Sequence, residues 1–132
     1  MVKVILDSNF LLVPFQFQID VFEELDKLLG KAEPVILSTT LEELNSLVRR
    51  RSEKMRRQAS AAIELVERCR IIGVERNREE SYDDVILRIA KEWECPVATN
   101  DAYLRKRLRE SGVTVVFLRQ RSHLEVDGNL PF

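Results

Sequence analysis

The apolar residues of the chain fall into short continuous runs separated by stretches of helical spacing. The continuous runs cover residues 2–6, 34–38, 71–74, 96–99 and 113–118. Runs of this length, bounded by polar or turn residues, are typical of buried strands. Because the runs are continuous rather than alternating, helices should cover both faces of the sheet that these strands form.

Between the runs, apolar residues recur every three or four positions, which predicts helices. These helices are expected over residues 19–29, 40–48, 55–66, 81–93 and 101–110. Gly30 is expected to end the first of them and Ser81 to cap the fourth. Residues 10–17 are also apolar, but Pro14 interrupts them and predicts a loop or a broken helical turn.

This order of strands and helices predicts the α/β class. We expect a three-layer α/β/α sandwich around a central parallel sheet of about five strands. A chain of 132 residues is of ordinary size for one domain. We assign residues 1–119 to that domain, and residues 120–132 to a C-terminal tail that is expected to be disordered.

The composition argues against several classes of protein. The 21 basic and 22 acidic residues nearly balance, so total charge does not indicate a nucleic-acid-binding protein. No apolar run approaches the ~20 residues of a membrane span, and the first residues do not resemble a signal peptide. We therefore expect a cytoplasmic protein without a membrane partner.

The cysteine and histidine content argues against a zinc site. Cys69 and Cys95 are isolated, and His123 is the single histidine. Two buried free thiols are the favoured interpretation, with a disulfide between them as the alternative.

Acidic residues follow several of the predicted strands. Asp7 comes directly after the first strand, and Asn100 and Asp101 come directly after the fourth. Glu43 and the pair Asp83–Asp84 lie in the first turns of two predicted helices. Because ligands bind beyond the carboxyl ends of the strands of an open parallel sheet, these acids should share one rim.

Each acid also has a purely structural explanation. Thr40 with Glu43, and Ser81 with Asp84, match the capping box at a helix start, and Asp101 is a suitable helix cap. As a set, however, the acids would place like charges in one crevice, which is unfavourable unless a cation offsets them. Carboxylate oxygens favour Mg²⁺ or Mn²⁺, and one or two such ions would suit phosphodiester hydrolysis.

Four segments carry a resemblance to a known family. They are Val4-Ile-Leu-Asp7-Ser-Asn9, Leu41-Glu-Glu43-Leu44, Ser81-Tyr-Asp-Asp84-Val-Ile-Leu-Arg-Ile-Ala90 and Val97-Ala-Thr-Asn-Asp101. In this order and at these intervals they resemble the PIN-domain nucleases. The later residues are similar to the archaeal branch near small-subunit ribosomal RNA-processing PIN proteins, and VapC-type toxins share the same acids.

The resemblance implies a Mg²⁺- or Mn²⁺-dependent endoribonuclease that cuts single-stranded RNA and is often a homodimer. It implies either an antitoxin or a ribosomal precursor particle as partner, and does not decide between them. The implied catalytic and metal-binding residues are Asp7, Glu43, Asp84 and Asp101. Asp84 is preferred as the third acid because Leu87 and Ala90 follow it at the family's spacing. Supporting positions are Asp83, Thr99, Asn9 and Asn100.

Basic residues near the acids are candidates for RNA contact. Phosphate contacts of this kind position RNA without reading its sequence. The candidates are Arg105, Lys106, Arg109, Arg49 and Arg50. The alternative is a solvated helix face with ion pairs such as Glu53 to Arg57. The apolar residues 11–17 form either a dimer interface or part of the core.

Other functions fit the sequence less well. Dinucleotide binding lacks a Gly-x-Gly-x-x-Gly motif, and a haloacid-dehalogenase-type phosphatase needs Asp-x-Asp where this chain has Asp7-Ser-Asn9. A receiver domain needs an acidic pair after the first strand and a lysine near the last. The remaining alternative is a non-catalytic RNA-binding or ribosome-assembly module with the same fold.

Overall fold

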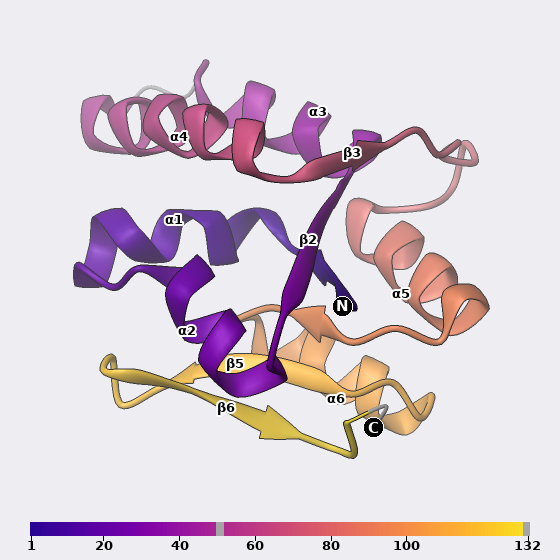
Figure 1. Cartoon of the computed structure of the whole chain (residues 1–132). Helices are drawn as coiled ribbons and strands as arrows, with labels where there is room; N and C mark the ends of the chain where they lie inside the picture. Colours follow the sequence, from indigo (N-terminus) through magenta and orange to yellow (C-terminus); the bar gives the residue numbers. More distant parts are fainter. Residues whose placement is uncertain (50–51, 131–132) are drawn as a thin grey trace.

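A computed structural model describes residues 1–49 and 52–130, and the chain in it alternates strands with helices (Figure 1). The strands are β1 Val2–Leu6, β2 Ala32–Leu37, β3 Arg70–Ile72, β4 Val97–Ala98, β5 Val115–Arg119 and β6 His123–Asp127. The helices are α1 Ser8–Phe17, α2 Val21–Leu29, α3 Ser38–Leu47, α4 Glu53–Leu65, α5 Tyr82–Trp93 and α6 Ala102–Glu110, with a short 3₁₀ turn, η1, at Val66–Arg68.

All six strands belong to one sheet in the order β3-β2-β1-β4-β5-β6. Neighbouring strands from β3 to β5 are parallel, with Ile5 of β1 opposite Val35 of β2 and Val97 of β4. Only β6 is antiparallel, and it pairs with β5 over five residues. Since β1 lies between β2 and β4, the residue that follows β1 is placed at the middle of the carboxyl rim.

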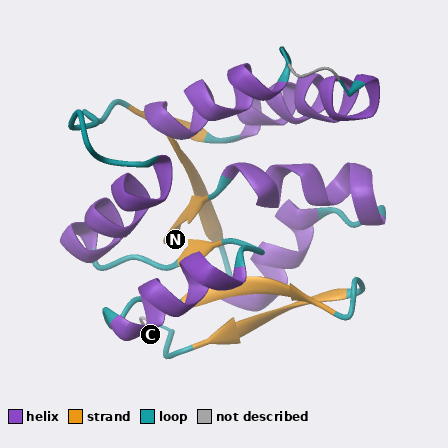
Figure 2. Cartoon of the chain, turned by 180° about the vertical axis from the view of Figure 1, so that it is seen from behind, coloured by secondary structure: helices purple, strands orange, loops and turns teal. Residues whose placement is uncertain are grey.

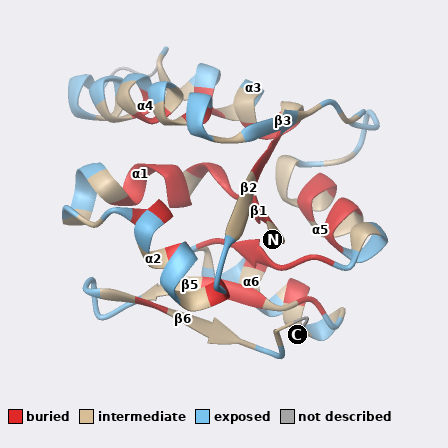
Figure 3. Ribbon diagram, in the orientation of Figure 1, coloured by how far each residue is buried: buried red, intermediate tan, exposed pale blue. Residues whose placement is uncertain are grey.

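Successive residues of β1 enter two separate cores, one on each face of the sheet. Val4 and Leu6 pack with α1, α2, α3 and α4, whereas Ile5 packs with α5 and α6. Figure 2 shows helices on both sides of the strands, and Figure 3 shows buried residues concentrated along β1 and the middle of α1. The predicted α/β/α sandwich is therefore confirmed, with a sixth strand added.

Residues 10–17 form a helix, so the prediction of a loop or broken turn was wrong. Pro14 lies inside α1 and cannot donate the hydrogen bond that the carbonyl of Phe10 would accept. The side chains Phe10 to Val13 are at most 5% exposed, and their burial offsets that loss. Most of the apolar run from residue 10 is thus core, while Phe15 remains 39% exposed.

The tail was also predicted wrongly as disordered, because residues 123–127 form β6. Leu124 is 6% exposed and joins the core on the α1 side of the sheet. Asp127 accepts hydrogen bonds from Arg105 and Arg109 of α6, at 2.9 and 3.1 Å. Pairing with β5, apolar burial and two ion pairs to α6 hold this segment in place. The division of the chain at residue 119 stays a prediction.

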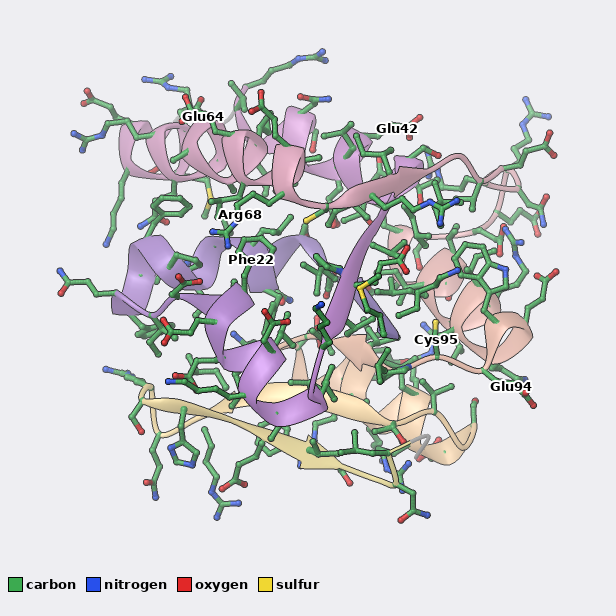
Figure 4. All side chains as sticks on the ribbon, in the orientation of Figure 1. Phe22, Glu42, Glu64, Arg68, Glu94 and Cys95 are labelled. Atoms are coloured by element: carbon green, nitrogen blue, oxygen red, sulfur yellow. The ribbon has the colours of Figure 1, made fainter. Side chains whose placement is uncertain are left out.

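The cysteines are free thiols, so the disulfide alternative was wrong. Cys69 packs against the core that contains Val4, and Cys95 belongs to the core on the other face of the sheet. Figure 4 shows Cys95 near the end of α5, and Arg68 over the ring of Phe22, 4.2 Å from its centre. Burial raises the pKa of Cys69 to about 12 and that of Cys95 to about 11, which keeps both thiols protonated.

Within residues 1–49 and 52–130, no helix combines the length and the apolar character that crossing a bilayer requires.

The packing of β6 predicts a large effect from a single truncation. Leu124→Ala should lower the free energy of unfolding by about 2 kcal/mol or more, because it removes buried apolar area and leaves a cavity. Glu125→Ala, on the same strand, removes ion pairs to Arg119 and His123 that lie near solvent and should cost less than ~1 kcal/mol. Urea denaturation of both variants measures the difference. Equal small losses would mean that β6 is not part of the folded sheet in solution.

Candidate active site

Asp7 lies at the centre of the carboxyl rim and is 3% exposed. Its backbone N–H donates to Ala98, which joins the end of β1 to β4. The Asp7 carboxylate accepts hydrogen bonds from Ser8 N–H at 2.8 Å, from Thr99 Oγ1 at 2.7 Å and from Asn9 Nδ2 at 3.1 Å. It also caps α1 through the Ser8 contact. These bonds fix the orientation of a carboxylate that has almost no access to solvent.

The surroundings of Asp7 disfavour its charged form. Burial is the largest influence, and the like charges of Asp83 and Glu43 add to it. The hydrogen bonds from Thr99 and Ser8 act in the opposite direction but are outweighed, so the pKa of Asp7 rises from 3.8 to about 7. A carboxyl with such a pKa is only partly ionised at neutral pH unless a positive charge is nearby.

Glu43 lies on α3 and faces the end of β1. Its Oε1 accepts a hydrogen bond from the hydroxyl of Ser8, which ties α3 to the start of α1. The capping box between Thr40 and Glu43 is not formed, because α3 begins at Ser38 and its N-terminus has no side-chain cap. The buried Oγ1 atoms of Thr39 and Thr40 have no hydrogen-bond partner among the described residues.

Asp101 both caps α6 and contacts Thr99, which in turn contacts Asp7. Its Oδ1 accepts from the backbone N–H groups of Tyr103 and Leu104, at 2.8 and 3.0 Å, and so caps α6. In the described part of the chain its Oδ2 accepts no hydrogen bond. The hydroxyl of Thr99 accepts from Asp101 N–H at 3.1 Å and donates to Asp7. Thr99 therefore links the two acids that follow β1 and β4.

The neighbouring residues Asp83 and Asp84 have different surroundings. The pKa of Asp83 is raised by burial and then by the like charges of Asp101 and Glu43. The carboxylate of Asp84 instead completes the capping box with Ser81 and accepts from Arg107 Nη2 at 2.8 Å. The Ser81 N–H and then Arg107 lower the pKa of Asp84. Asp83 is thus coupled to the other acids, whereas Asp84 is held by a helix cap and an arginine.

Asn9 and Asn100 connect the acids to the last parallel strand. Asn9 donates to Asp7 with its Nδ2 and accepts from Asn100 N–H with its Oδ1, at 3.1 Å in both cases. Asn100 Oδ1 in turn accepts from the N–H of Leu118 in β5, at 2.9 Å. The two side chains span the carboxyl ends of β1, β4 and β5.

Two residues of this network did not enter the predicted site, Ser8 and Arg107. Ser8 follows Asp7 directly, and that adjacency was a signal available in the sequence. Arg107 reaches Asp84 from another helix, and no local spacing reveals such a contact.

The predicted RNA-binding residues do not form one free basic face. Arg105 and Arg109 are paired with Asp127, and the Arg105 guanidinium lies 3.7 Å from the centre of the Phe117 ring. Lys106 and Arg49 are exposed, and Arg50 lies outside the described residues. RNA contact by these five residues stays a prediction, with Asp127 as a competitor for two of them.

The site has the donor chemistry of a hard cation. Asp7, Glu43, Asp83 and Asp101 offer only carboxylate oxygens, which suit Mg²⁺ or Mn²⁺. Among the described residues, no three His, Cys, Asp or Glu side chains converge closely enough to hold an ion as they stand. Because Asp7 is buried beside two like charges and its pKa is raised, a cation bound there would be electrostatically favourable. The residues therefore fit the ion in donor type and in charge.

A pH-dependent stability should follow from the Asp7 pKa. The unfolded carboxyl loses its proton near pH 4 and the folded one near pH 7. Between these values the folded state holds more protons, so the free energy of unfolding falls as pH rises. Asp7→Asn removes this loss, and in EDTA its stability relative to wild type should improve by ~2–4 kcal/mol from pH 4.5 to pH 8. Urea denaturation at both pH values measures the change, and a difference that is constant with pH would contradict the raised pKa.

Asp83 and Asp84 offer a matched pair for a second prediction. Asp84→Asn weakens the contact with Arg107 and the reciprocal cap with Ser81, so the metal-free variant should melt below wild type. Asp83→Asn removes repulsion with Asp101 and Glu43, so it should melt at or above wild type. Thermal denaturation in EDTA compares the two variants. The reverse order would mean that Asp83 rather than Asp84 has the structural role.

Comparison with known proteins finds a relative of similar sequence and solved structures with a similar fold. The chain is 33% identical over 132 residues to "Ribonuclease VapC4" of Methanocaldococcus jannaschii, covering 97% of this chain and 98% of that protein. A solved structure of the PIN domain endonuclease Utp24 superimposes with a TM-score of 0.78 at 27% identity, covering 97% of this chain and 92% of the other.

A more distant structure has the same fold. VapBC2 from Rickettsia felis, solved bound to a DNA fragment from its promoter, gives a TM-score of 0.64 at 17% identity, covering 89% of this chain and 99% of the other.

Residues 4–121 match the family described as PIN-like domain. The resemblance seen in the sequence is confirmed, and the chain belongs to the PIN-like domain family.

Proposed function

We propose that this protein is a Mg²⁺- or Mn²⁺-dependent endoribonuclease that hydrolyses phosphodiester bonds in single-stranded RNA. The observation that carries the proposal is the buried Asp7 carboxyl, coupled to Asp83 and Glu43 at the middle of the carboxyl rim. The mutual repulsion of these like charges lowers the stability of the folded protein, whereas a bound cation would offset it. The relatives named a ribonuclease and a PIN domain endonuclease support this interpretation.

We assign the cation ligands to Asp7, Glu43, Asp83 and Asp101. This set replaces Asp84, favoured from sequence, by its neighbour, because the Asp84 carboxylate is occupied by Ser81 and Arg107. Asp84 then acts as a positioning residue that fixes the start of α5 and hence Asp83. A bound divalent cation lowers the pKa of its water, which supplies a nucleophile near neutral pH.

The residues of the chain would contribute orientation and charge. Thr99 and Asn9 hold the Asp7 carboxylate in place, and Ser8 does the same for Glu43. Because the pKa of Asp7 is about 7, cation binding must displace its proton, so affinity for the cation should increase as pH rises through that value. We also propose that the protein is cytoplasmic, that it forms a homodimer, and that its partner is either an antitoxin or a ribosomal precursor particle.

The decisive test is cleavage of labelled single-stranded RNA with Mn²⁺ or with EDTA. Wild type should cut only with the cation, and Mn²⁺ should raise its melting temperature by mass action. Asp7→Asn and Asp83→Asn should each reduce the cleavage rate more than about 100-fold, and Asp84→Asn by about 10-fold or less.

The Asp7→Asn protein, purified in parallel, controls for contaminating ribonucleases. RNA binding without cleavage, unchanged by Mn²⁺, would favour the non-catalytic RNA-binding or assembly module instead. Equal loss in the Asp83 and Asp84 variants would reject the assignment of Asp83 as the ligand.

A further inference from the structure

A groove lies beside the acidic site, near the carboxyl end of β5. One hollow of about 500 Å³ is lined by residues that include Asn9, Phe17 and Arg121. A second of about 330 Å³ is lined by Thr99, Arg105 and Phe117 among others. The two hollows share Asn100, Leu118 and Gln120, so they form one continuous surface feature beside β5. Its occupant would lie directly next to the acids, because Asn9 and Thr99 both donate to Asp7.

The turn between β5 and β6 lies over this groove in an unfavourable backbone conformation. Gln120 and Arg121 have φ values of 54° and 58°, a region that favours glycine and asparagine. Ser122 N–H donates to the carbonyl of Arg119, which closes a tight turn with Gln120 and Arg121 at its centre. Asn-Gly is the sequence that such hairpin turns favour. The chain instead places two long polar side chains there, and both are exposed and line the groove.

Retained strain of this kind is typical of functional positions. A turn that served only to connect β5 to β6 would be more stable with Asn-Gly, so the side chains of Gln120 and Arg121 need another reason to be there.

The charge on Arg121 is available, unlike that of its neighbours. Arg105 is paired with Asp127, and Arg119 is paired with Glu125 at 3.0 Å. Arg121 forms no ion pair within residues 1–49 and 52–130, and its guanidinium lies 5.8 Å from the centre of the Phe17 ring. An unpaired guanidinium next to an aromatic ring is the combination that binds a single-stranded nucleic acid, through phosphate contact and base stacking.

We propose that the Gln120–Arg121 turn is an RNA-contacting element that holds the substrate strand beside the acids. Arg121 binds a backbone phosphate adjacent to the one that is cut, and Gln120 hydrogen-bonds a ribose or base edge in the shared part of the groove. This inference rests on the proposed ribonuclease function and names the path of its substrate. The turn contributes binding and positioning, and it takes no part in bond breaking.

Three variants test the proposal. Arg121→Gln removes the charge and keeps the backbone conformation. The double variant Gln120→Asn, Arg121→Gly replaces both side chains with the residues that the turn favours. Lys91→Gln, at an exposed position near the C-terminal end of α5, removes one positive charge away from the groove and is the matched control.

Binding of a fluorescent single-stranded RNA is measured in EDTA at several salt concentrations, and cleavage kinetics are measured with Mn²⁺. Arg121→Gln should weaken binding about 3- to 10-fold at low salt and lower the slope of log affinity against log salt by about 0.7. In cleavage, KM should rise by a similar factor with kcat nearly unchanged. The double variant should bind as weakly, yet melt several degrees above wild type because the backbone strain is relieved.

If both turn variants match Lys91→Gln in affinity, salt slope and KM while wild type still cuts RNA, this inference is overturned and the proposed function stands. A double variant that melts higher and binds RNA as well as wild type overturns the role of the two side chains in the same way. A wild-type protein that neither binds nor cuts RNA removes the proposed function, and the inference with it.

Discussion

Burial of the Asp7 carboxyl at the end of the central strand is the constraint around which the rest of the site is arranged. The position cannot be relaxed toward solvent, because β1 is flanked by β2 and β4 and covered by helices on both faces. The carboxylate accepts hydrogen bonds from Ser8, Asn9 and Thr99, and it forms no salt bridge with any residue that the structure describes. These donors orient the carboxylate but do not neutralise it, and burial with the neighbouring acids keeps its pKa raised.

The same rim also collects the starts of four helices, which favours anions there. Asp7 caps α1, Asp101 caps α6, Glu43 follows the start of α3, and Asp83 lies in the first turn of α5. The partial positive charges of these helix ends stabilise nearby carboxylates. Capping and ion binding are therefore compatible in one residue, as Asp101 shows by using only Oδ1 for its cap. A capping motif in a sequence does not by itself argue against a functional role.

The sequence was sufficient for the features that depend on periodicity and strand order. Apolar runs predicted the sandwich, and the rule that strand ends share a rim placed Asp7, Glu43 and Asp101 in one region. The choice between Asp83 and Asp84 as a cation ligand depends on contacts that spacing does not reveal. The two residues differ by one position in α5, and Arg107 of another helix contacts Asp84. Tertiary burial likewise overrode the local penalty at Pro14. In β6, polar and apolar residues alternate as in a half-buried strand, a local signal that the prediction of a disordered tail overlooked.

The two edges of the sheet have a consequence for how copies of the chain can meet. At one edge β3 has only three residues, and it begins with exposed Arg70. At the other edge, every second residue of β6 carries a titratable side chain: His123, Glu125 and Asp127. Short and charged edges are poor templates for backbone pairing with another strand. Association by extending the sheet from one molecule into the next is therefore disfavoured, which leaves the helical faces as the surfaces through which a second copy would have to pack.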